Sequence, residues 1–285
     1  MRQLRTTLGL AVLVAAGGIV AAAADYREHL GLQLWSLRDQ AKQSVPRALE
    51  LTAGFGFKEV ETAGTADLTA EAFAHELQAH KLEAVSAHVG YGEFRKDPAA
   101  AIQGAKALGV RYIIIPALPQ RKTGFTVEAA HGIAQEFNTW GRLAKAAGLR
   151  FGYHTHGFEF VAAVDGTTPF DILMRETDPA LVCFQMDVFW VVHAGQDPVR
   201  LLRAYPGRWQ LMHVKDMRRG TVVGLSTGMA PPTDKVAVGT GQIDWPSVLR
   251  VAAEVGIERY FIEDECEEPL TTIPASMRYL RALKW

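Results

Sequence analysis

Short apolar runs alternate with segments of helical periodicity along the chain after about residue 25. The runs are rich in β-branched and aromatic residues, and they have the length of buried strands. Runs that stay apolar instead of alternating predict strands buried on both faces, as in a parallel sheet. The eight runs cover residues 31–35, 58–62, 82–88, 112–116, 150–154, 181–187, 209–215 and 259–263.

The segments between the runs predict amphipathic helices, because their apolar residues lie three and four positions apart. Asp244 before Trp245 and Pro246 suits a helix N-cap with proline in the first turn. Gly54, Gly109, Gly148 and Gly256 suit C-terminal ends of the predicted helices. The expected helices include residues 45–54, 70–80, 99–108, 127–147, 198–205, 245–253 and 270–283.

Eight strand–helix units in about 260 residues predict that the sheet closes into a (β/α)8 TIM barrel. We expect this α/β fold to form a single domain over residues 25–285. The rival is an open, doubly wound sheet, but no G-x-G-x-x-G motif follows the first run. The longest irregular segment, residues 217–242, follows the seventh run and is interpreted as a lid over the barrel mouth.

The first 24 residues have the pattern of a secretory signal peptide. Arg2 and Arg5 precede a short apolar stretch over residues 8–20, and four alanines end at Ala24, before Asp25. We therefore expect cleavage after Ala24 and a periplasmic or secreted protein; an uncleaved membrane anchor is the alternative. After cleavage, no later stretch is apolar enough for a membrane helix.

Net charge, cysteine content and the surface pattern give expectations about nucleic-acid binding, disulfides and oligomers. The leader contains two of the 30 basic residues and none of the 31 acidic ones, so the remainder carries a net charge of −3. This balance gives no electrostatic footprint for nucleic acid. Cys183 and Cys266 fall at different heights on non-adjacent runs, so we expect two thiols instead of a disulfide. Association into a homo-oligomer stays open, because no pattern marks a pairing surface.

Polar residues follow the ends of four predicted strands, where barrel enzymes place their chemistry. The segment FGYHTHGFEF puts His154 and His156 on one face of a strand, because side chains alternate. Converging buried carboxylates need a common partner, and a cation is the simplest one. The set contains no cysteine, which favours one Mn, Mg, Co or catalytic Zn ion. The expected metal ligands are Glu159, Asp187, His213 and Glu263, with Asp216 and Glu265 as nearby competitors.

Motifs at these strand ends resemble the xylose-isomerase-like barrels, also called the sugar phosphate isomerase/epimerase family. The resemblance covers residues 30–283 and is carried by GLQLWSLRD, VETAG, SAHVG, YHTHGFEF, MDVFWVVHAGQDP, HVKD, VGTGQIDW and YFIEDE. It implies a divalent metal held by the four ligands named above, with Glu159 and Glu263 also exchanging protons with the substrate. It further implies polar substrate contacts from Glu61, His88, His156 and Lys215.

The same residues suggest a chemistry. Moving a proton beside a carbonyl needs a base, an acid and stabilisation of the ene-diolate, which a chelated metal supplies. We therefore expect a metal-dependent sugar isomerase or epimerase acting on a small carbohydrate, with Trp190, Phe158 and Trp35 as an apolar platform. The alternative is a periplasmic keto-glycoside lyase, hydratase or dehydratase using the same enolate. A nucleic-acid repair enzyme and a non-catalytic sugar-binding protein fit the charge and the ligand set less well.

Overall fold

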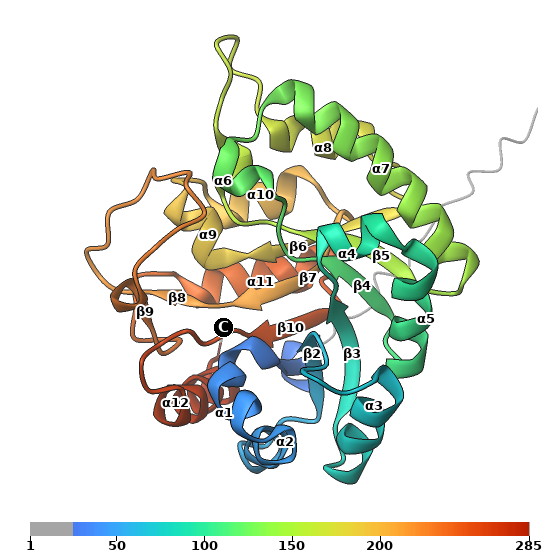
Figure 1. Ribbon diagram of the computed structural model, residues 1–285. Helices are drawn as coiled ribbons and strands as arrows, with labels where there is room; N and C mark the ends of the chain where they lie inside the picture. Colours follow the sequence, from blue (N-terminus) through green and yellow to red (C-terminus); the bar gives the residue numbers. More distant parts are fainter. Residues whose placement is uncertain (1–24, 285) are drawn as a thin grey trace, which may run out of the picture.

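Eight parallel strands close into a barrel in the computed structural model, which describes residues 25–284 (Figure 1). Their order around the barrel is β1-β10-β7-β6-β5-β4-β3-β2, and the pairing of β1 with β10 closes it. The single-domain TIM barrel prediction is confirmed, and the open sheet is excluded. The strands are β1 (Leu30–Gln33), β2 (Glu59–Ala63), β3 (Glu83–His88), β4 (Tyr112–Ile115), β5 (Arg150–His154), β6 (Val182–Asp187), β7 (Trp209–Val214) and β10 (Arg259–Ile262).

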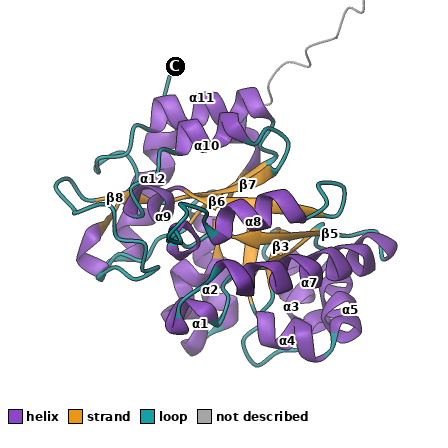
Figure 2. Ribbon diagram, turned by 90° about the horizontal axis from the view of Figure 1, so that it is seen from above, coloured by secondary structure: helices purple, strands orange, loops and turns teal. Residues whose placement is uncertain are grey.

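The helices lie outside the strands (Figure 2). Asp244 accepts a hydrogen bond from the backbone of Ser247, and Gly256 ends the same helix in the left-handed region, as the sequence predicted. The seven expected helices are α2 (Val45–Gly54), α3 (Ala70–Ala79), α5 (Pro98–Leu108), α7 (Val127–Ala146), α10 (Pro198–Ala204), α11 (Trp245–Val255) and α12 (Pro269–Ala282).

Several short elements were not predicted, because three to eight residues give little periodicity to detect. The most important for the site begins at Asp187, where the apolar run continues into a helix that the carboxylate caps. The unpredicted helices are α1 (Arg38–Gln43), α4 (Tyr91–Lys96), α6 (Gln120–Thr123), α8 (Pro169–Glu176) and α9 (Val188–His193). The unpredicted 3-10 turns are η1 (Tyr26–His29), η2 (Leu34–Leu37), η3 (Phe158–Phe160) and η4 (Pro232–Asp234).

The segment after β7 is less irregular than expected. Its two ends pair as the antiparallel strands β8 (Asp216–Met217) and β9 (Lys235–Val236). The carboxylate of Asp216 accepts hydrogen bonds from the backbone of Gly239 and Gly241 at 2.8 and 3.1 Å. Asp216 therefore fixes the base of this loop and is not one of the converging ligands.

Apolar side chains fill the barrel interior below the mouth. Val85, Tyr112, Ile114, Cys183, Leu211 and Phe261 form one buried cluster there. Gly152 makes room for it, because a Cβ at this position would lie 2.7 Å from Ile114 Cδ1 and 2.8 Å from Cys183 Sγ. This apolar cluster, called the plug below, closes the barrel axis at the end opposite the mouth. The polar strand ends therefore face a single open side.

Two further expectations concern the thiols and the leader. Cys183 and Cys266 are both free, as predicted. The proposed signal peptide over residues 1–24 lies outside the described residues. Within the part of the chain that is described, no helix has the length and apolarity to cross a membrane.

The plug predicts the stability of a conservative variant. Gly152→Ala should lower the free energy of unfolding by about 1–3 kcal/mol, because the added methyl overpacks a closed core. Gly132→Ala is the matched control: this α7 position has nothing within 4 Å of the added carbon, and alanine should gain about 0.5–1 kcal/mol there. Denaturant unfolding of both variants measures the difference, and equal effects would contradict the packing account.

Candidate functional site

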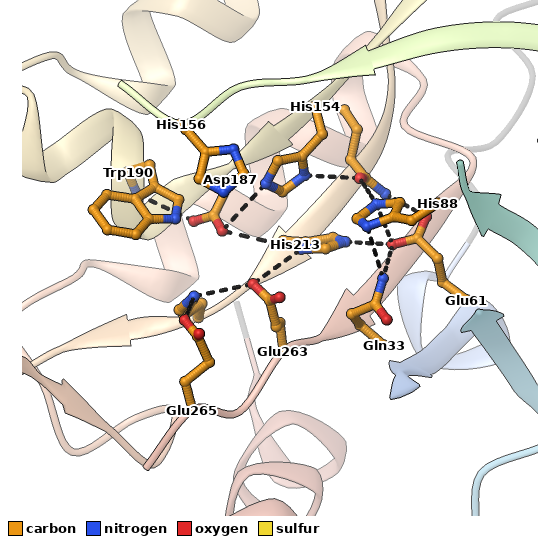
Figure 3. Close-up of polar contacts among 12 residues, drawn as sticks. Gln33, Glu61, His88, His154, His156, Asp187, Trp190, His213, Glu263 and Glu265 are labelled. Atoms are coloured by element: carbon orange, nitrogen blue, oxygen red, sulfur yellow. Dashed lines mark hydrogen bonds and ion pairs between the residues drawn. The ribbon is translucent and has the colours of Figure 1, made fainter. Parts of the chain in front are cut away.

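Three of the four expected ligands meet at the mouth of the barrel (Figure 3). Asp187 ends β6, His213 lies in β7, and Glu263 follows β10. His213 Nδ1 lies 3.4 Å from Glu263 Oε2 and 4.0 Å from Asp187 Oδ2. Their potential ligand atoms all lie within 4.8 Å of one another. Adjacent parallel strands bring these distant residues together, because their carboxyl ends share one face.

His154, at the end of β5, lies beside this group and contacts it through Asp187. Its Nε2 lies 3.7 Å from Asp187 Oδ2, and its Nδ1 lies 2.8 Å from Gln185 Oε1. The amide oxygen can only accept, so Nδ1 carries the proton and the Nε2 lone pair faces the carboxylate. Asp187 Oδ2 thus has one imidazole nitrogen from His154 and one from His213 beside it. Together with Glu263, these residues offer nitrogen and oxygen donors that suit a divalent metal.

Asp187 supplies the clearest sign that a cation belongs here. Its Oδ1 accepts from the backbone of Trp190 at 3.1 Å, but its buried Oδ2 has no hydrogen-bond partner within residues 25–284. Burial raises the pKa of Asp187 to about 7, because the carboxylate charge loses its hydration. An unpartnered buried carboxylate oxygen is costly, and coordination to a metal would remove that cost. The residues present fit such an ion.

Glu159 does not join the group, and its prediction as a metal ligand and proton-transfer residue is corrected here. Gly157 adopts a φ of 87°, and the chain then turns into the 3-10 helix η3. The Glu159 carboxylate accepts from the Tyr153 hydroxyl and from the His156 backbone N–H, the latter at 3.1 Å to its Oε1. The turn thus buries this carboxylate beside its own strand and outside the group of Asp187, His213 and Glu263.

Glu61 is the centre of a second polar cluster, beneath the first. It is fully buried, and its oxygens lie 2.5 Å from His213 Nε2 and 2.9 Å from His88 Nε2. Burial opposes ionisation of Glu61, but these two imidazoles outweigh it and hold the pKa well below its usual range. Glu61 is not among the described residues that line the cavity, so it supports His213 instead of contacting substrate, contrary to expectation.

A cavity of about 910 Å³ opens above the converging ligands. The other predicted substrate contacts, His88, His156, Lys215 and Trp190, all line it. The His156 ring lies 5.6 Å from the Trp190 ring, centroid to centroid, and burial lowers the pKa of His156 to about 3. Trp35 also lines the cavity, whereas Phe158 does not and packs against Phe125. The cavity is also bounded by the loop after β7, through Gly228, Met229, Ala230, Pro231 and Lys235.

Lys215 is the buried cation of the cavity wall. Its Nζ donates to Glu263 Oε2 at 3.0 Å and to the Glu265 carboxylate. Lys235 Nζ also lies 3.0 Å from Glu265. Burial opposes the charge on Lys215, but Glu263 and Glu265 outweigh it and raise the pKa of the ammonium. Lys215 is therefore protonated at neutral pH and sits beside Glu263.

Sequence reasoning missed His154, Gln185 and Arg121 as site residues. His154 stood in the motif that was singled out, but the carboxylate of Glu159 in the same motif was preferred as the ligand. Gln185 precedes Asp187 by two positions, so strand alternation was an available signal that both point into the barrel. Arg121 lies in the unpredicted helix α6 and lines the cavity, and no motif marked it.

Comparison with known proteins finds similar sequences. The chain is 30% identical over 161 residues to an inosose dehydratase from Clostridium tetani, covering 54% of this chain and 53% of that protein. The chain thus spans about half the length of the curated relatives it matches.

Two solved structures share the fold. A sugar phosphate isomerase/epimerase from Parabacteroides distasonis superposes with a TM-score of 0.74 at 24% identity, covering 94% of this chain and 98% of that one. The IOLI protein, solved with a binding zinc atom, gives a TM-score of 0.65 at 16% identity, covering 89% and 95%. The sequence pattern of one family matches residues 49–283, so the chain belongs to the xylose isomerase-like TIM barrel family.

Proposed function

We propose that the protein is a metal-dependent lyase that eliminates water or an alcohol from a keto-sugar or a related keto-polyol. The carrying observation is that one carboxylate of the ligand group, Glu263, lines the cavity, while Glu159 is held away by Tyr153 and the His156 backbone. Epimerisation in the expected form uses two carboxylates that exchange protons with the substrate. Elimination needs one base and one acid.

One divalent metal would be held by His154, Asp187, His213 and Glu263. Two imidazoles and two carboxylates suit zinc, manganese or cobalt better than magnesium, which prefers oxygen ligands alone. The zinc in the IOLI structure supports this choice by analogy of fold. When bound, such an ion polarises a substrate carbonyl and acidifies the neighbouring C–H bond.

Glu263 is proposed as the base. Its Oε2 faces His213 and Lys215, and its Oε1 accepts no hydrogen bond from the described chain, which leaves that oxygen for substrate. Burial opposes its ionisation, but Lys215 and His213 hold the pKa of Glu263 well below its usual range. Glu263 is therefore charged at neutral pH and able to accept a proton.

Lys215 is proposed as the acid. Glu263 takes the proton from the carbon beside the carbonyl, and that electron pair forms the carbon–carbon double bond. The C–O bond at the next carbon then breaks, and the departing oxygen takes a proton from the Lys215 ammonium. Lys215 recovers a proton from solvent, and Glu263 releases one, so the net change is loss of water or an alcohol.

The cavity wall suits a small carbohydrate. Trp190 offers an aromatic face, with Lys215 Nζ 5.5 Å from its ring centroid. His156 has an unpartnered Nδ1 for a substrate hydroxyl group, and His88 lines the cavity with its ring. The dehydratase named among the relatives acts as a lyase by its name, which supports elimination here.

Isomerisation or epimerisation is the second candidate. His156 lines the same cavity, and its buried Nδ1 has no partner in residues 25–284. This neutral imidazole is a second proton-transfer group in place of Glu159. The name of the structural neighbour from Parabacteroides distasonis points the same way.

Export stays a proposal that rests on the basic, apolar and alanine-rich leader. If it is correct, protein recovered from the periplasm or the medium begins at Asp25. N-terminal sequencing of the native protein tests this, and an intact residue 1 would contradict it.

The corrected ligand set predicts metal retention. His154→Ala should reduce the bound divalent metal from about one per chain to near zero, because it removes one of four ligands. Glu159→Gln is the matched control and should retain the metal, because that carboxylate lies outside the group. Elemental analysis of the purified proteins measures both. The reverse pattern, loss in Glu159→Gln and retention in His154→Ala, would restore the original assignment.

Because Glu263 is proposed as the base and Lys215 as the acid, substitution of each residue should impair a different step. In deuterated water, Glu263→Gln should abolish both hydrogen exchange beside the carbonyl and product formation on a panel of keto-inositols and 3-keto-glycosides. Lys215→Met should keep exchange measurable but slow release of water or alcohol by about 10²–10⁴-fold, as expected for loss of a general acid. Proton NMR measures the hydrogen exchange, and product analysis measures the release of water or alcohol. Exchange into an intact, epimerised sugar without elimination would favour the second candidate.

A further inference from the structure

Gln185 lies at the junction of the two buried polar clusters. It stands on β6, two residues before Asp187, and has no exposed surface. Its Nε2 donates to Glu61 Oε2 at 2.8 Å. Its Oε1 lies 2.8 Å from His154 Nδ1 and 2.9 Å from His88 Nε2. One amide thus joins a buried carboxylate to two imidazoles.

The orientation of this amide is fixed by its surroundings. An ionised carboxylate can only accept hydrogen bonds, and Glu61 accepts from Gln33 at 2.8 Å and from Ser86 at 2.6 Å in addition to Gln185. The amide NH2 must therefore face Glu61. Its oxygen faces the imidazoles, and both imidazoles must donate to it. A flipped amide would oppose oxygen to oxygen at Glu61.

This orientation selects the tautomer of His154. With Nδ1 donating to Gln185, the neutral ring carries no proton on Nε2, which lies 3.7 Å from Asp187 Oδ2. His213 Nε2 donates to Glu61 at 2.5 Å, so its Nδ1 is the nitrogen that faces Asp187 and Glu263. His154 Nε2 and His213 Nδ1 therefore both lie beside Asp187 Oδ2.

The same network excludes a competing cation site. His88, His154 and His213 also have potential ligand atoms within 4.8 Å of one another. Both nitrogens of His88 are engaged, however: Nε2 donates to Gln185, and Nδ1 lies 3.2 Å from the Gln33 amide nitrogen. His88 therefore has no free lone pair for a metal, and the two carboxylate-facing nitrogens remain.

We propose that Gln185 is a positioning residue: it holds His154 as the Nδ1–H tautomer and so prepares Nε2 to bind the metal. This inference rests on the proposed metal site but not on the reaction. Partners that orient a ligating histidine typically change metal affinity by about 10–100-fold when removed. Glutamine suits the position because it donates to the Glu61 charge and accepts from the imidazole, which no apolar side chain of similar size can do.

Zinc affinity of three variants tests the proposal, measured by competition with a chelator. Gln185→Leu should weaken binding by about 10–100-fold. Ser86→Ala is the matched control, because Ser86 donates to the same Glu61 oxygen as Gln185 but has no recorded hydrogen bond to an imidazole. It should weaken binding by less than about fivefold. Equal losses in these two variants would show that packing around Glu61 matters, and not the tautomer, and would overturn the proposal.

Nitrogen NMR of the metal-free proteins reads the tautomer directly. His154 should carry its proton on Nδ1 in the native chain and in Ser86→Ala, and should lose this preference in Gln185→Leu. An Nε2–H tautomer in the native chain would overturn the proposal. Since no metal or substrate is present, this readout is independent of whether the lyase assignment holds.

Gln185→Glu separates hydrogen bonding from volume if the leucine variant folds poorly. A protonated glutamic acid can still donate to Glu61 and accept from His154, so zinc affinity should be restored relative to Gln185→Leu. Deprotonation of the introduced glutamic acid would place two carboxylates side by side. The zinc affinity of Gln185→Glu should therefore fall below that of the native chain as pH rises. Equal affinities of the two Gln185 variants at every pH would contradict the proposal.

Discussion

Buried negative charge on the barrel axis is the constraint on which this structure depends. Glu61 and Asp187 both lie fully inside the barrel, where an uncompensated carboxylate is strongly disfavoured. Glu61 is compensated by several donors from strands around the barrel. Asp187 keeps one oxygen that the described chain leaves without a hydrogen bond. The difference between these two carboxylates separates a supporting cluster from a cation site.

The Glu61 cluster and the Asp187 cluster lie at different heights along the barrel axis and have different roles. The apolar plug below them closes the barrel, and glycines such as Gly152 give its side chains room. The Glu61 network above the plug fixes histidine rings, and the next layer presents their lone pairs, two carboxylates and Lys215 to the cavity. The protonated lysine lies beside Glu263 in one wall of the cavity. This pairing is the reason why we propose elimination instead of proton exchange between two glutamates.

Much of the fold was predictable from the sequence, because strand runs and helix caps are local signals. All eight barrel strands lie at the expected runs, and Asp187, His213 and Glu263 converge because parallel strand ends must. Glu159 was misplaced because its position depends on the positive φ at Gly157, which a residue pattern does not reveal. The helix after Asp187 was missed because its apolar residues continue the strand pattern. The roles of Glu61 and Gln185 depend on hydrogen-bond directions that only coordinates show.

The most direct test of the central claim is anomalous X-ray diffraction from crystals grown with zinc. The account predicts one peak about 2.0–2.2 Å from His154 Nε2, His213 Nδ1 and an oxygen of each of Asp187 and Glu263, with Glu159 still bound to Tyr153. A peak coordinated by Glu159 instead of His154, or one among His88, His154 and His213, would contradict it.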